Sequence, residues 1–301
     1  MYKAFGIVSS SGRNIYVDGM QDYRPIGAFS FLGRYRVIDF PISNMTNSDI
    51  DRIQIYINNK PRSVVEHVGT GRHYNINSKS GKLQLLFSEH NNDNDIYNTD
   101  IDNYYSNLEC IEAVHYPYVV IAPNYMIYTT DYSKLIDAHI ESGADVTMLY
   151  HSVDNAKENY LNCHILNLNR QKGVLSIEHN HGNAKNRNIF LDTYVMSKEL
   201  FISLIHKAKE ISSLYTLADV INAGCRDGEL DVRGISHRGY FASITDFKSY
   251  HDANMDLIDY KTATDLFHDN WPIYTRTNNS CPTHYFDTAN VSNSVISNGS
   301  M

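Results

Sequence analysis

The stretch Ala4-Phe5-Gly6-Ile7-Val8-Ser9 predicts a buried β-strand, because a short apolar run that ends in a polar turn is typical of a strand in a parallel sheet. Similar runs recur along the first half of the chain, with amphipathic stretches of helical length between them. We predict strands at Ala4–Ser9, Arg52–Ile57, Lys82–Phe87, Tyr118–Ala122 and Asp145–Tyr150. This alternation favours an α/β fold, with a mainly parallel, doubly wound sheet that carries helices on both faces.

The stretches between these runs predict helices. They cover Pro41–Ser48 behind Asp39 as a candidate cap, Pro61–Val68, Ile101–Ala113, and Tyr132–Glu141, which Gly143 closes. In the second half, Cys163–Leu168 and Gly173–Ile177 predict a hairpin, and Ile189–Met196 predicts a strand. The remaining predicted elements of this half are helices at Lys198–Ala208 and Leu214–Ala223, short strands near Leu230–Gly234 and Tyr240–Ser243, and a helix over Asp246–Asp259. We therefore expect one α/β domain over residues 1–260.

The character of the sequence changes from Lys261 onward, where helical periodicity fades and Pro, Asn and Thr become frequent. Residues 261–288 are therefore predicted to be a linker. Beyond them, Ala289, Val295 and Met301 lie six residues apart, which is the spacing of a left-handed β-helix coil, although chance could also produce it. Because such a coil needs about three repeats to bury its apolar face, residues 289–301 are predicted to be the truncated beginning of one.

Composition excludes several classes of protein. The 301 residues are 42% hydrophobic and 20% charged, which is typical of a globular protein. No apolar run approaches the roughly 18 residues of a membrane span, so no membrane partner is expected. The four cysteines lie more than 50 residues apart, which argues against zinc pairs and disulfide frameworks and predicts a cytoplasmic location. A net charge of −8 argues against nucleic acid as a partner.

The segment after the first predicted strand is where a nucleotide-binding sheet presents a glycine-rich phosphate loop. Here it reads Ser9-Ser10-Ser11-Gly12-Arg13-Asn14-Ile15. One glycine among serines still offers backbone N–H groups, but each added Cβ restricts positive φ and the close approach of a phosphate. On these residues alone, an ordinary polar turn is favoured over a phosphate loop.

A second dense segment is Arg34-Tyr35-Arg36-Val37-Ile38-Asp39-Phe40-Pro41-Ile42-Ser43-Asn44. On an extended backbone, Arg34 and Arg36 share one face, and Asp39 is near enough to be a partner. A binding role and a structural ion-pair cluster both remain open from the residues alone. Histidines are also numerous, and His164 with His179 and His181 suggests a metal site. No further ligand stands at a recognised spacing, so the sequence argues against zinc.

Several blocks together resemble the glucose-1-phosphate adenylyltransferases, or ADP-glucose pyrophosphorylases, of bacterial glycogen synthesis. These blocks are Arg24–Asn44, Asn47-Ser48, Glu66–Gly71, Gly239-Tyr240 and Ala253–Leu257. The resemblance extends over essentially the whole chain. It implies a nucleotidyltransferase-like domain followed by a left-handed β-helix that helps to assemble tetramers.

The chain departs from this family at the positions that bind phosphates. Active members have Gly-Gly-x-Gly-Thr-Arg-Leu where this chain has Ser9 to Ile15, so only Gly12 is retained, and Arg13 stands one position before the family arginine. A family Lys-Pro pair becomes Ile26-Gly27. The family Glu-Lys-Pro on the sugar-phosphate side becomes Glu178-His179-Asn180, which removes another lysine.

The chain also departs from the family at the metal ligands. Active members supply two carboxylates for Mg²⁺, one in Gly-Asp-His and one in Arg-Asp-Val-Gly-Thr. Here the corresponding positions hold Asn124 and Ser243. The resemblance therefore implies no bound metal and no catalytic residue in this chain, with Asp246 as the one nearby carboxylate to consider as a substitute.

A retained framework that lacks the reactive groups resembles the D-type (GlgD) subunit of this family. The resemblance implies a regulatory subunit that pairs with a catalytic ADP-glucose pyrophosphorylase subunit in a hetero-oligomer, with weak binding of a sugar phosphate or nucleotide possible. The Arg34, Arg36, Asp39, Ser43 and Asn44 block is then structural or part of an interface. Two alternatives remain: an active adenylyltransferase that uses Arg13 and Asp246, and a module that senses a sugar phosphate or nucleotide.

Overall fold

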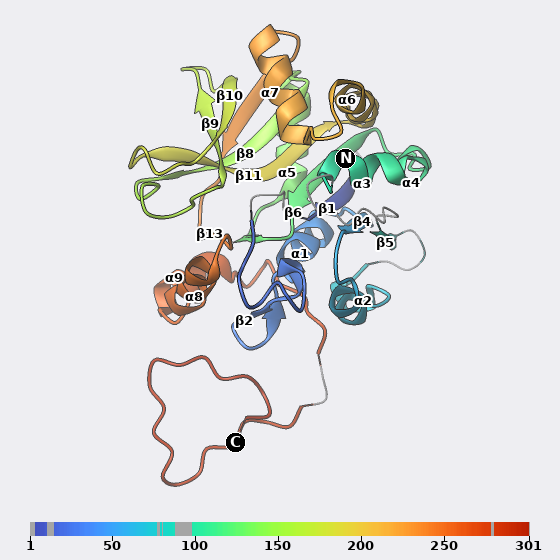
Figure 1. Ribbon diagram of the computed structural model, residues 1–301. Helices are drawn as coiled ribbons and strands as arrows, with labels where there is room; N and C mark the ends of the chain where they lie inside the picture. Colours follow the sequence, from blue (N-terminus) through green and yellow to red (C-terminus); the bar gives the residue numbers. More distant parts are fainter. Residues whose placement is uncertain are drawn as a thin grey trace.

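The computed structural model describes residues 4–10, 15–76, 79, 81–87, 98–277 and 280–300. Within these residues, nine strands form one large sheet (Figure 1). They are β1 (Ala4–Ser9), β4 (Arg52–Ile57), β5 (Lys82–Phe87), β6 (Tyr118–Pro123), β8 (Val146–Val153), β9 (His164–Leu168), β10 (Val174–His179), β11 (Arg187–Ser197) and β12 (Val232–Ser236). The sheet order is β10-β9-β11-β6-β1-β4-β5, and β8 joins β11 to β12.

The half of the sheet around β1 is parallel, as predicted. β1 pairs in parallel with β4 on one side and with β6 on the other, and β5 extends the sheet beyond β4. The chain thus runs from β1 to one neighbour and later returns to the other. In open α/β sheets, ligands bind in the crevice outside the carboxyl ends of the strands at such a switch point. The candidate site is therefore expected beside the ends of β1 and β6.

Helices cover both faces of the sheet, which confirms the predicted fold class. On one face lie α1 (Asp39–Asn47), α2 (Arg62–Val68) and α5 (Tyr132–Ser142). On the other lie α3 (Asp100–Ser106), α4 (Leu108–Glu112), α6 (Lys198–Ile211) and α7 (Leu217–Asp227). An apolar core lies on each face of the sheet, and alternate side chains of β1 pack into the two cores. Val8 belongs to the core under α1, α2 and α5, and Phe5 and Ile7 belong to the core under α3, α4, α6 and α7. The apolar run therefore has period two, with both faces buried.

Two short ribbons and two helices complete the body. The ribbons are β2 (Ser30–Phe31) with β3 (Tyr35–Arg36), and β7 (Met126–Tyr128) with β13 (Phe241–Ser243). The single-turn helices η1 (Ile26–Ala28) and η2 (Arg72–Tyr74) lie in the first third of the chain. The helices α8 (Phe247–Asp256) and α9 (Tyr260–Leu266) follow β13. No helix among the described residues is long and apolar enough to cross a membrane.

Two predicted details were wrong. The helix expected over Ile101–Ala113 is two helices that meet at Asn107, where φ is −117°. Asp39 does not cap α1, because Ile38 holds the cap position and the Asp39 carboxylate is used elsewhere. The linker over residues 261–288 stays a prediction, and its first residues belong to the helix α9.

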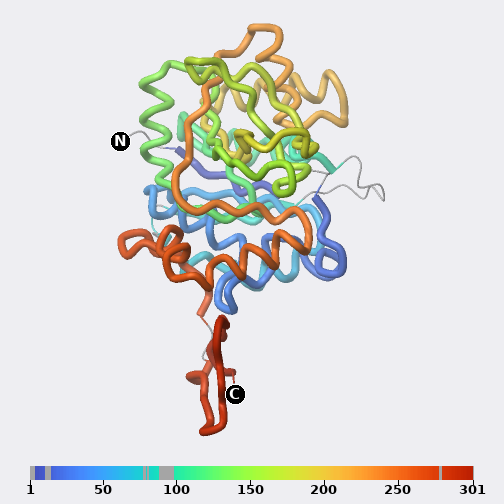
Figure 2. The backbone as a smooth tube through the Cα atoms, turned by 90° about the vertical axis from the view of Figure 1, so that its left-hand side faces the viewer, coloured from blue at the N-terminus to red at the C-terminus, as the bar shows by residue number. Residues whose placement is uncertain are grey.

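The C-terminal segment extends away from the body as an open loop (Figures 1 and 2). Its described residues, 280–300, form no strand, and Val291 and Val295 are 48% and 45% exposed. Met301 lies outside the described residues. The β-helix coil expected over residues 289–301 therefore stays a prediction.

Candidate functional site

Three segments that are far apart in the sequence meet at the carboxyl edge of the sheet. β1 ends at Ser9, which pairs in register with Pro123 at the end of β6. The backbone N–H of Asn124 then donates to the carbonyl of Ser9 at 2.9 Å. In the next ribbon Ser243 pairs with Met126, two residues beyond Asn124. The structure thus brings Ser9, Asn124 and Ser243 into one neighbourhood.

The described part of the loop after β1 is held by the body of the protein. The Tyr104 hydroxyl donates to Ser9 Oγ at 2.9 Å, and Ser10 Oγ donates to the carbonyl of Tyr56 at 2.9 Å. Ser11, Gly12 and Arg13 lie outside the described residues. Ser9 and Ser10 therefore use their hydroxyls to anchor the loop.

Asn124 and Ser243 are neutral and almost fully buried, with exposed fractions of 5% and 3%. Ser243 Oγ lies 3.3 Å from the sulfur of Cys163. Burial raises the pKa of Cys163 to about 12, against the opposing effect of this hydrogen bond, so the neighbour of Ser243 is a neutral thiol. Mg²⁺ is a hard cation that proteins usually hold through one or two carboxylates and substrate phosphates. An amide, a hydroxyl and a thiol do not fit that ion.

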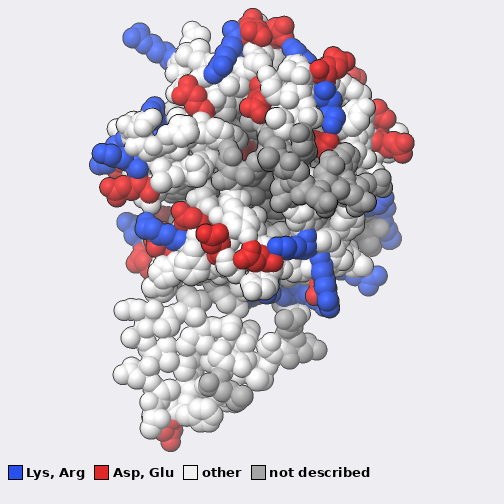
Figure 3. Space-filling model, viewed as in Figure 1, with Lys and Arg blue, Asp and Glu red and all other residues white. Residues whose placement is uncertain are grey.

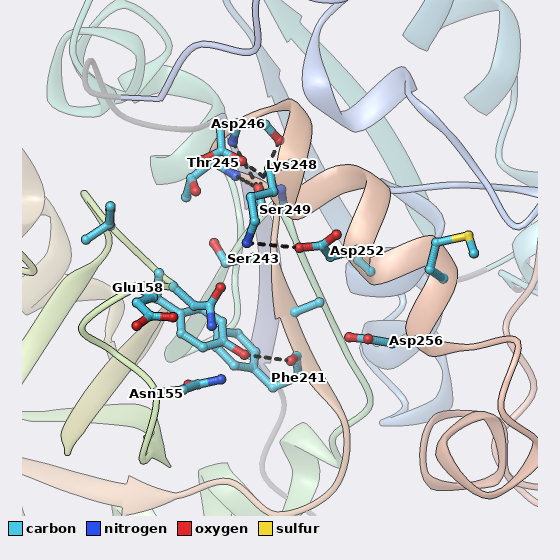
Figure 4. Close-up of a pocket in the computed structure, with 16 residues that line it drawn as sticks. Asn155, Glu158, Phe241, Ser243, Thr245, Asp246, Lys248, Ser249, Asp252 and Asp256 are labelled. Carbon is cyan, nitrogen blue, oxygen red and sulfur yellow. Dashed lines mark hydrogen bonds and ion pairs between the residues drawn. The ribbon is translucent and has the colours of Figure 1, made fainter. Parts of the chain in front are cut away.

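The carboxylate of Asp246 has a structural role at the start of α8. Its Oδ1 accepts the backbone N–H of Ser249 at 2.7 Å, and Ser249 Oγ accepts the backbone N–H of Asp246 at 3.0 Å. This reciprocal pair is a capping box. Asp246 is exposed and lines a cavity of about 290 Å³ together with Ser243 (Figure 4).

Among the described residues, five charged side chains line this cavity, four of them acidic, and the lysine pairs with one of the acids. Lys248 and Asp252 form an ion pair of 3.2 Å across one turn of α8 (Figure 4). Tyr160 stacks on Phe241, with ring centroids 5.3 Å apart. The described residues contain no group of three or more His, Cys, Asp or Glu side chains that could hold a metal ion.

On the predicted sugar-phosphate side, Glu178 and His179 point to different surroundings. Glu178 is exposed and accepts a hydrogen bond from Ser176 Oγ at 3.0 Å. The His179 ring lies 4.7 Å from the ring of His164, measured between centroids, and the Nδ1 atom of His179 is buried without a partner. His164 in turn contacts Asp192 at 2.9 Å. Asp192 escaped the sequence analysis, because no local pattern marks a single aspartate inside a strand.

The Arg34 to Asn44 block mostly serves packing within the body. Asp39 is fully buried and accepts from the backbone N–H of Arg36 at 2.8 Å and from the Tyr74 hydroxyl at 2.6 Å. His67 Nε2 lies 2.6 Å from the same carboxylate. The Arg36 guanidinium instead donates to the carbonyl of Ala28 at 3.0 Å. The predicted pairing of Asp39 with an arginine is thus made through the backbone of Arg36.

The other members of the block lie at its two ends. Ser43 Oγ accepts the backbone N–H of Tyr274 at 2.9 Å, and Asn44 Oδ1 accepts from the Trp271 indole at 2.9 Å. Arg34 is exposed, with its guanidinium 5.6 Å from the Tyr35 ring centroid. Ser43 and Asn44 therefore attach the chain beyond α9 to α1, and Arg34 is the member on the surface.

Comparisons with known proteins agree with this architecture. Residues 23–260 match the model of a protein family described as nucleotidyl transferase. A glucose-1-phosphate adenylyltransferase of Clostridium novyi is 27% identical over 274 residues, which cover 90% of this chain and 71% of that protein. One of Fervidobacterium nodosum is 26% identical over 305 residues, which cover 99% of this chain and 72% of that protein.

Among solved structures, a Bacillus anthracis protein described as a glucose-1-phosphate thymidylyltransferase, in complex with sucrose, has a similar fold. It matches with a TM-score of 0.64 and 14% sequence identity, over 89% of this chain and 98% of that chain.

Proposed function

The chain belongs to the nucleotidyl transferase family, and from that premise we propose that it is a non-catalytic or weakly catalytic subunit in glycogen synthesis. It binds a catalytic ADP-glucose pyrophosphorylase chain and raises the activity of that chain. The reaction is the conversion of ATP and glucose 1-phosphate to ADP-glucose and diphosphate. The similarity to glucose-1-phosphate adenylyltransferases supports the choice of reaction.

The observation that carries the proposal is the pair of buried neutral side chains, Asn124 and Ser243, at the carboxyl edge. Phosphoryl transfer depends on positioning and on neutralisation of charge, with little covalent help from the protein. By analogy, loss of one oxyanion-hole donor in an acyl-transfer enzyme costs about 10²–10³ in rate. A site without carboxylates at these positions is therefore expected to be slow at best.

A subunit without its own chemistry can still activate a partner. If one chain binds the active conformation of another more tightly than the inactive one, it shifts the population toward the active state. The coupling requires only differential binding at the contact between the two chains. The body of this chain has a buried core on both faces of the sheet, so it can fold and hold such a contact without performing chemistry.

The first experiment measures diphosphate release by the purified chain with ATP, glucose 1-phosphate and Mg²⁺. We expect little release from the chain alone. When it is mixed with a catalytic subunit, we expect the two to co-elute and the turnover or substrate affinity of the mixture to rise. Turnover by the isolated chain near that of a catalytic homologue, or a failure to co-elute, would contradict the proposal.

The variant Asp246→Asn is the matched control for the alternative of an active enzyme. Asparagine is as good a helix cap as aspartate, so α8 should stay intact while the charge is removed. If Asp246 only caps α8, the activity of the mixture should be unchanged. A loss of activity in the mixture would instead assign Asp246 to metal binding and support catalysis by this chain.

A further inference from the structure

Asp192 occupies an unusual backbone position at the edge of the candidate site. The register of β11 against β8 shifts between Phe190 and Thr193, and Asp192 lies in this irregularity with a φ of +42°. A side chain in the left-handed region costs of order 1 kcal/mol, and such residues gather at functional sites.

Asp192 lies near the carboxyl end of β6. β11 is antiparallel to β6, and their pairing ends at Tyr194 opposite Ile121, two residues from Asp192 and two residues before Pro123. The contact of Asp192 with Tyr125, which follows Asn124, places its carboxylate near the ends of the two strands that border the switch point.

Two donors from other elements hold the Asp192 carboxylate. The hydroxyl of Tyr125, the residue that follows Asn124, donates to Oδ2. His164 Nδ1 lies 2.9 Å from Oδ1. The side chains of Asp192 and His164 are only 16% and 23% exposed.

The charges around this contact are consistent with an ion pair. Burial opposes the charged imidazolium of His164, but the nearby Asp192 carboxylate outweighs it and raises the pKa of His164. Burial, and after it the charge of Asp192, raises the pKa of Tyr125, so that hydroxyl keeps its proton and remains a donor. The carboxylate therefore satisfies two donors that would otherwise face the edge of the sheet.

Donors that converge on one carboxylate can equally bind the oxygen atoms of a hydroxyl- or phosphate-bearing ligand. In open α/β sheets, ligands bind outside the carboxyl ends of the strands at the switch point, which here is the edge where Ser9 and Pro123 pair. The His179 ring packs beside the His164 ring. Its Nδ1 atom is buried and has no hydrogen-bond partner. Tyr125 and His164 thus hold Asp192 among hydrogen-bonding groups, with His179 beside His164, which is the composition expected of a ligand site.

We propose that the Asp192 side chain, held by Tyr125 and His164, occupies the sugar-phosphate half of the site and keeps this chain from binding a phosphorylated hexose. The inference rests on the proposed function and deepens it, because it names the group that closes the site. Removal of the Asp192 side chain should leave space for the sugar phosphate. It should also free the Tyr125 hydroxyl and His164 Nδ1 to bind that ligand.

Two variants at this position separate the effect of the side chain from that of the backbone. Glycine accepts a φ of +42° without strain, so Asp192→Gly should fold while it removes the bulk of the side chain. Asparagine tolerates the left-handed region and nearly matches aspartate in size, so Asp192→Asn is the control that keeps the position filled.

The test is calorimetric titration of glucose 1-phosphate into the chain without ATP or Mg²⁺. We expect saturable binding to Asp192→Gly, and binding at least tenfold weaker or absent in the wild type and in Asp192→Asn. Equal affinity of wild type and Asp192→Gly would overturn the proposal. So would the absence of binding to a folded Asp192→Gly chain, with folding checked by circular dichroism.

If Asp192→Gly does not fold because His164 is left without its ion-pair partner, Asp192→Gly combined with His164→Gln takes its place, since a neutral amide needs no carboxylate beside it. The outcomes remain separate from those of the proposed function. Sugar-phosphate binding by the wild-type chain without turnover would overturn the role of Asp192 alone. Diphosphate release by the wild-type chain would overturn the proposed function.

Discussion

Asp39 shows how much of the body depends on one buried carboxylate. It is fully buried, and its oxygens meet the backbone N–H of Arg36, the ring of His67 and the hydroxyl of Tyr74. These partners come from the β2–β3 ribbon, from α2 and from η2. The carboxylate therefore joins three pieces of chain at the start of α1.

The variant Asp39→Asn should lower the free energy of unfolding by about 2–4 kcal/mol. An amide has one acceptor oxygen, so at least one of the three donors would face an NH₂ group in the interior and lose its partner. Urea denaturation measures the loss. The matched control is Asp137→Asn on the exposed side of α5, which should change stability by less than about 0.5 kcal/mol. Equal effects of the two variants would contradict the structural role of Asp39.

At the residue scale, the sequence supplied the identities of the site residues, and their spatial relation came from the structure. Asn124 and Ser243 attracted attention because of a family resemblance, but only the pairing of β7 with β13 brings them together. No sequence motif pointed to Asp192. Its importance depends on the irregularity in β11 and on donors from two other segments, Tyr125 and His164, and no local pattern encodes either.

Among the secondary-structure elements, β8 and the segment after β12 are joined by a pair of histidines, of which His237 is buried and His151 is half-buried. His237 Nδ1 lies 3.2 Å from His151 Nδ1, and His237 Nε2 lies 3.1 Å from the carbonyl of Thr129. The backbone N–H of His237 donates to the carbonyl of Tyr150. Because Nε2 faces a carbonyl, it carries the proton, and the neutral Nδ1 accepts from His151. A second proton on His237 would place two N–H groups against each other.

Stability should therefore fall as the solution becomes acidic. Burial lowers the pKa of His237 to about 4, with the charge of His151 as a smaller effect in the same direction. In the unfolded chain the pKa of this histidine is about 6.5. As the pH falls from 6.5 toward 4, the unfolded chain therefore binds a proton that the folded chain does not, so acid favours unfolding. The free energy of unfolding that this histidine contributes is lost by about pH 4. It amounts to about 3 kcal/mol, at 1.4 kcal/mol per pKa unit.

Urea denaturation between pH 7 and pH 4.5 tests this prediction. The variant His237→Gln should be less stable than the wild type at pH 7, and its stability should fall less steeply with acid. His206→Gln, at an exposed position on α6, should keep the wild-type pH profile. An unchanged slope in His237→Gln would show that the pair does not govern the acid sensitivity.

Elements with a strong apolar pattern could be predicted almost residue by residue. β1, β4 and β5 have the predicted bounds. In β1 and β4 nearly every side chain is buried, as is typical of a parallel sheet, whereas β5 is the edge strand and is mostly half-buried or exposed. The predicted helix over Ile101–Ala113 failed at Asn107, whose amide donates to the carbonyls of Asn103 and Phe87. Asparagine side chains that bind nearby backbone carbonyls compete with helix continuation, and the bond to Phe87 depends on tertiary structure.

At the scale of the whole molecule, the chain beyond α9 returns to the body before it leaves again. Trp271 and Tyr274 are hydrogen-bonded to Asn44 and Ser43 of α1. Farther on, Gly33 packs closely against Ser297, where a Cβ on the glycine would lie 3.1 Å from the serine Cβ. The predicted linker is thus attached to α1 at Trp271 and Tyr274, and the segment beyond it approaches Gly33 at Ser297, which composition cannot reveal.

The protruding segment is also different in charge from the body. On the face in Figure 3, positive and negative side chains are spread over the body, and the C-terminal segment is almost uncharged. The aromatic side chains Tyr285 and Phe286 are 61% and 66% exposed. A weakly charged, partly apolar surface of this kind is consistent with the proposed assembly with another subunit.

The attachment of this segment can be followed through Trp271, the single tryptophan of the chain. Asn44 Oδ1 accepts from the Trp271 indole, and the Asn44 amide donates to the carbonyl of Tyr128 at 2.9 Å. Asn44 Oδ1 also accepts the backbone N–H of Thr130 at 3.3 Å. Asn44→Ala should therefore cost about 2–4 kcal/mol, because these interior bonds are lost. The tryptophan emission should shift to longer wavelength, and its quenching by iodide should increase. Asn47→Ala is the matched control, since the half-buried Asn47 makes one solvent-exposed bond to the carbonyl of Pro272, and its loss should cost less than about 1 kcal/mol. A folded Asn44→Ala chain with wild-type emission and quenching would show that this residue does not hold the segment on α1.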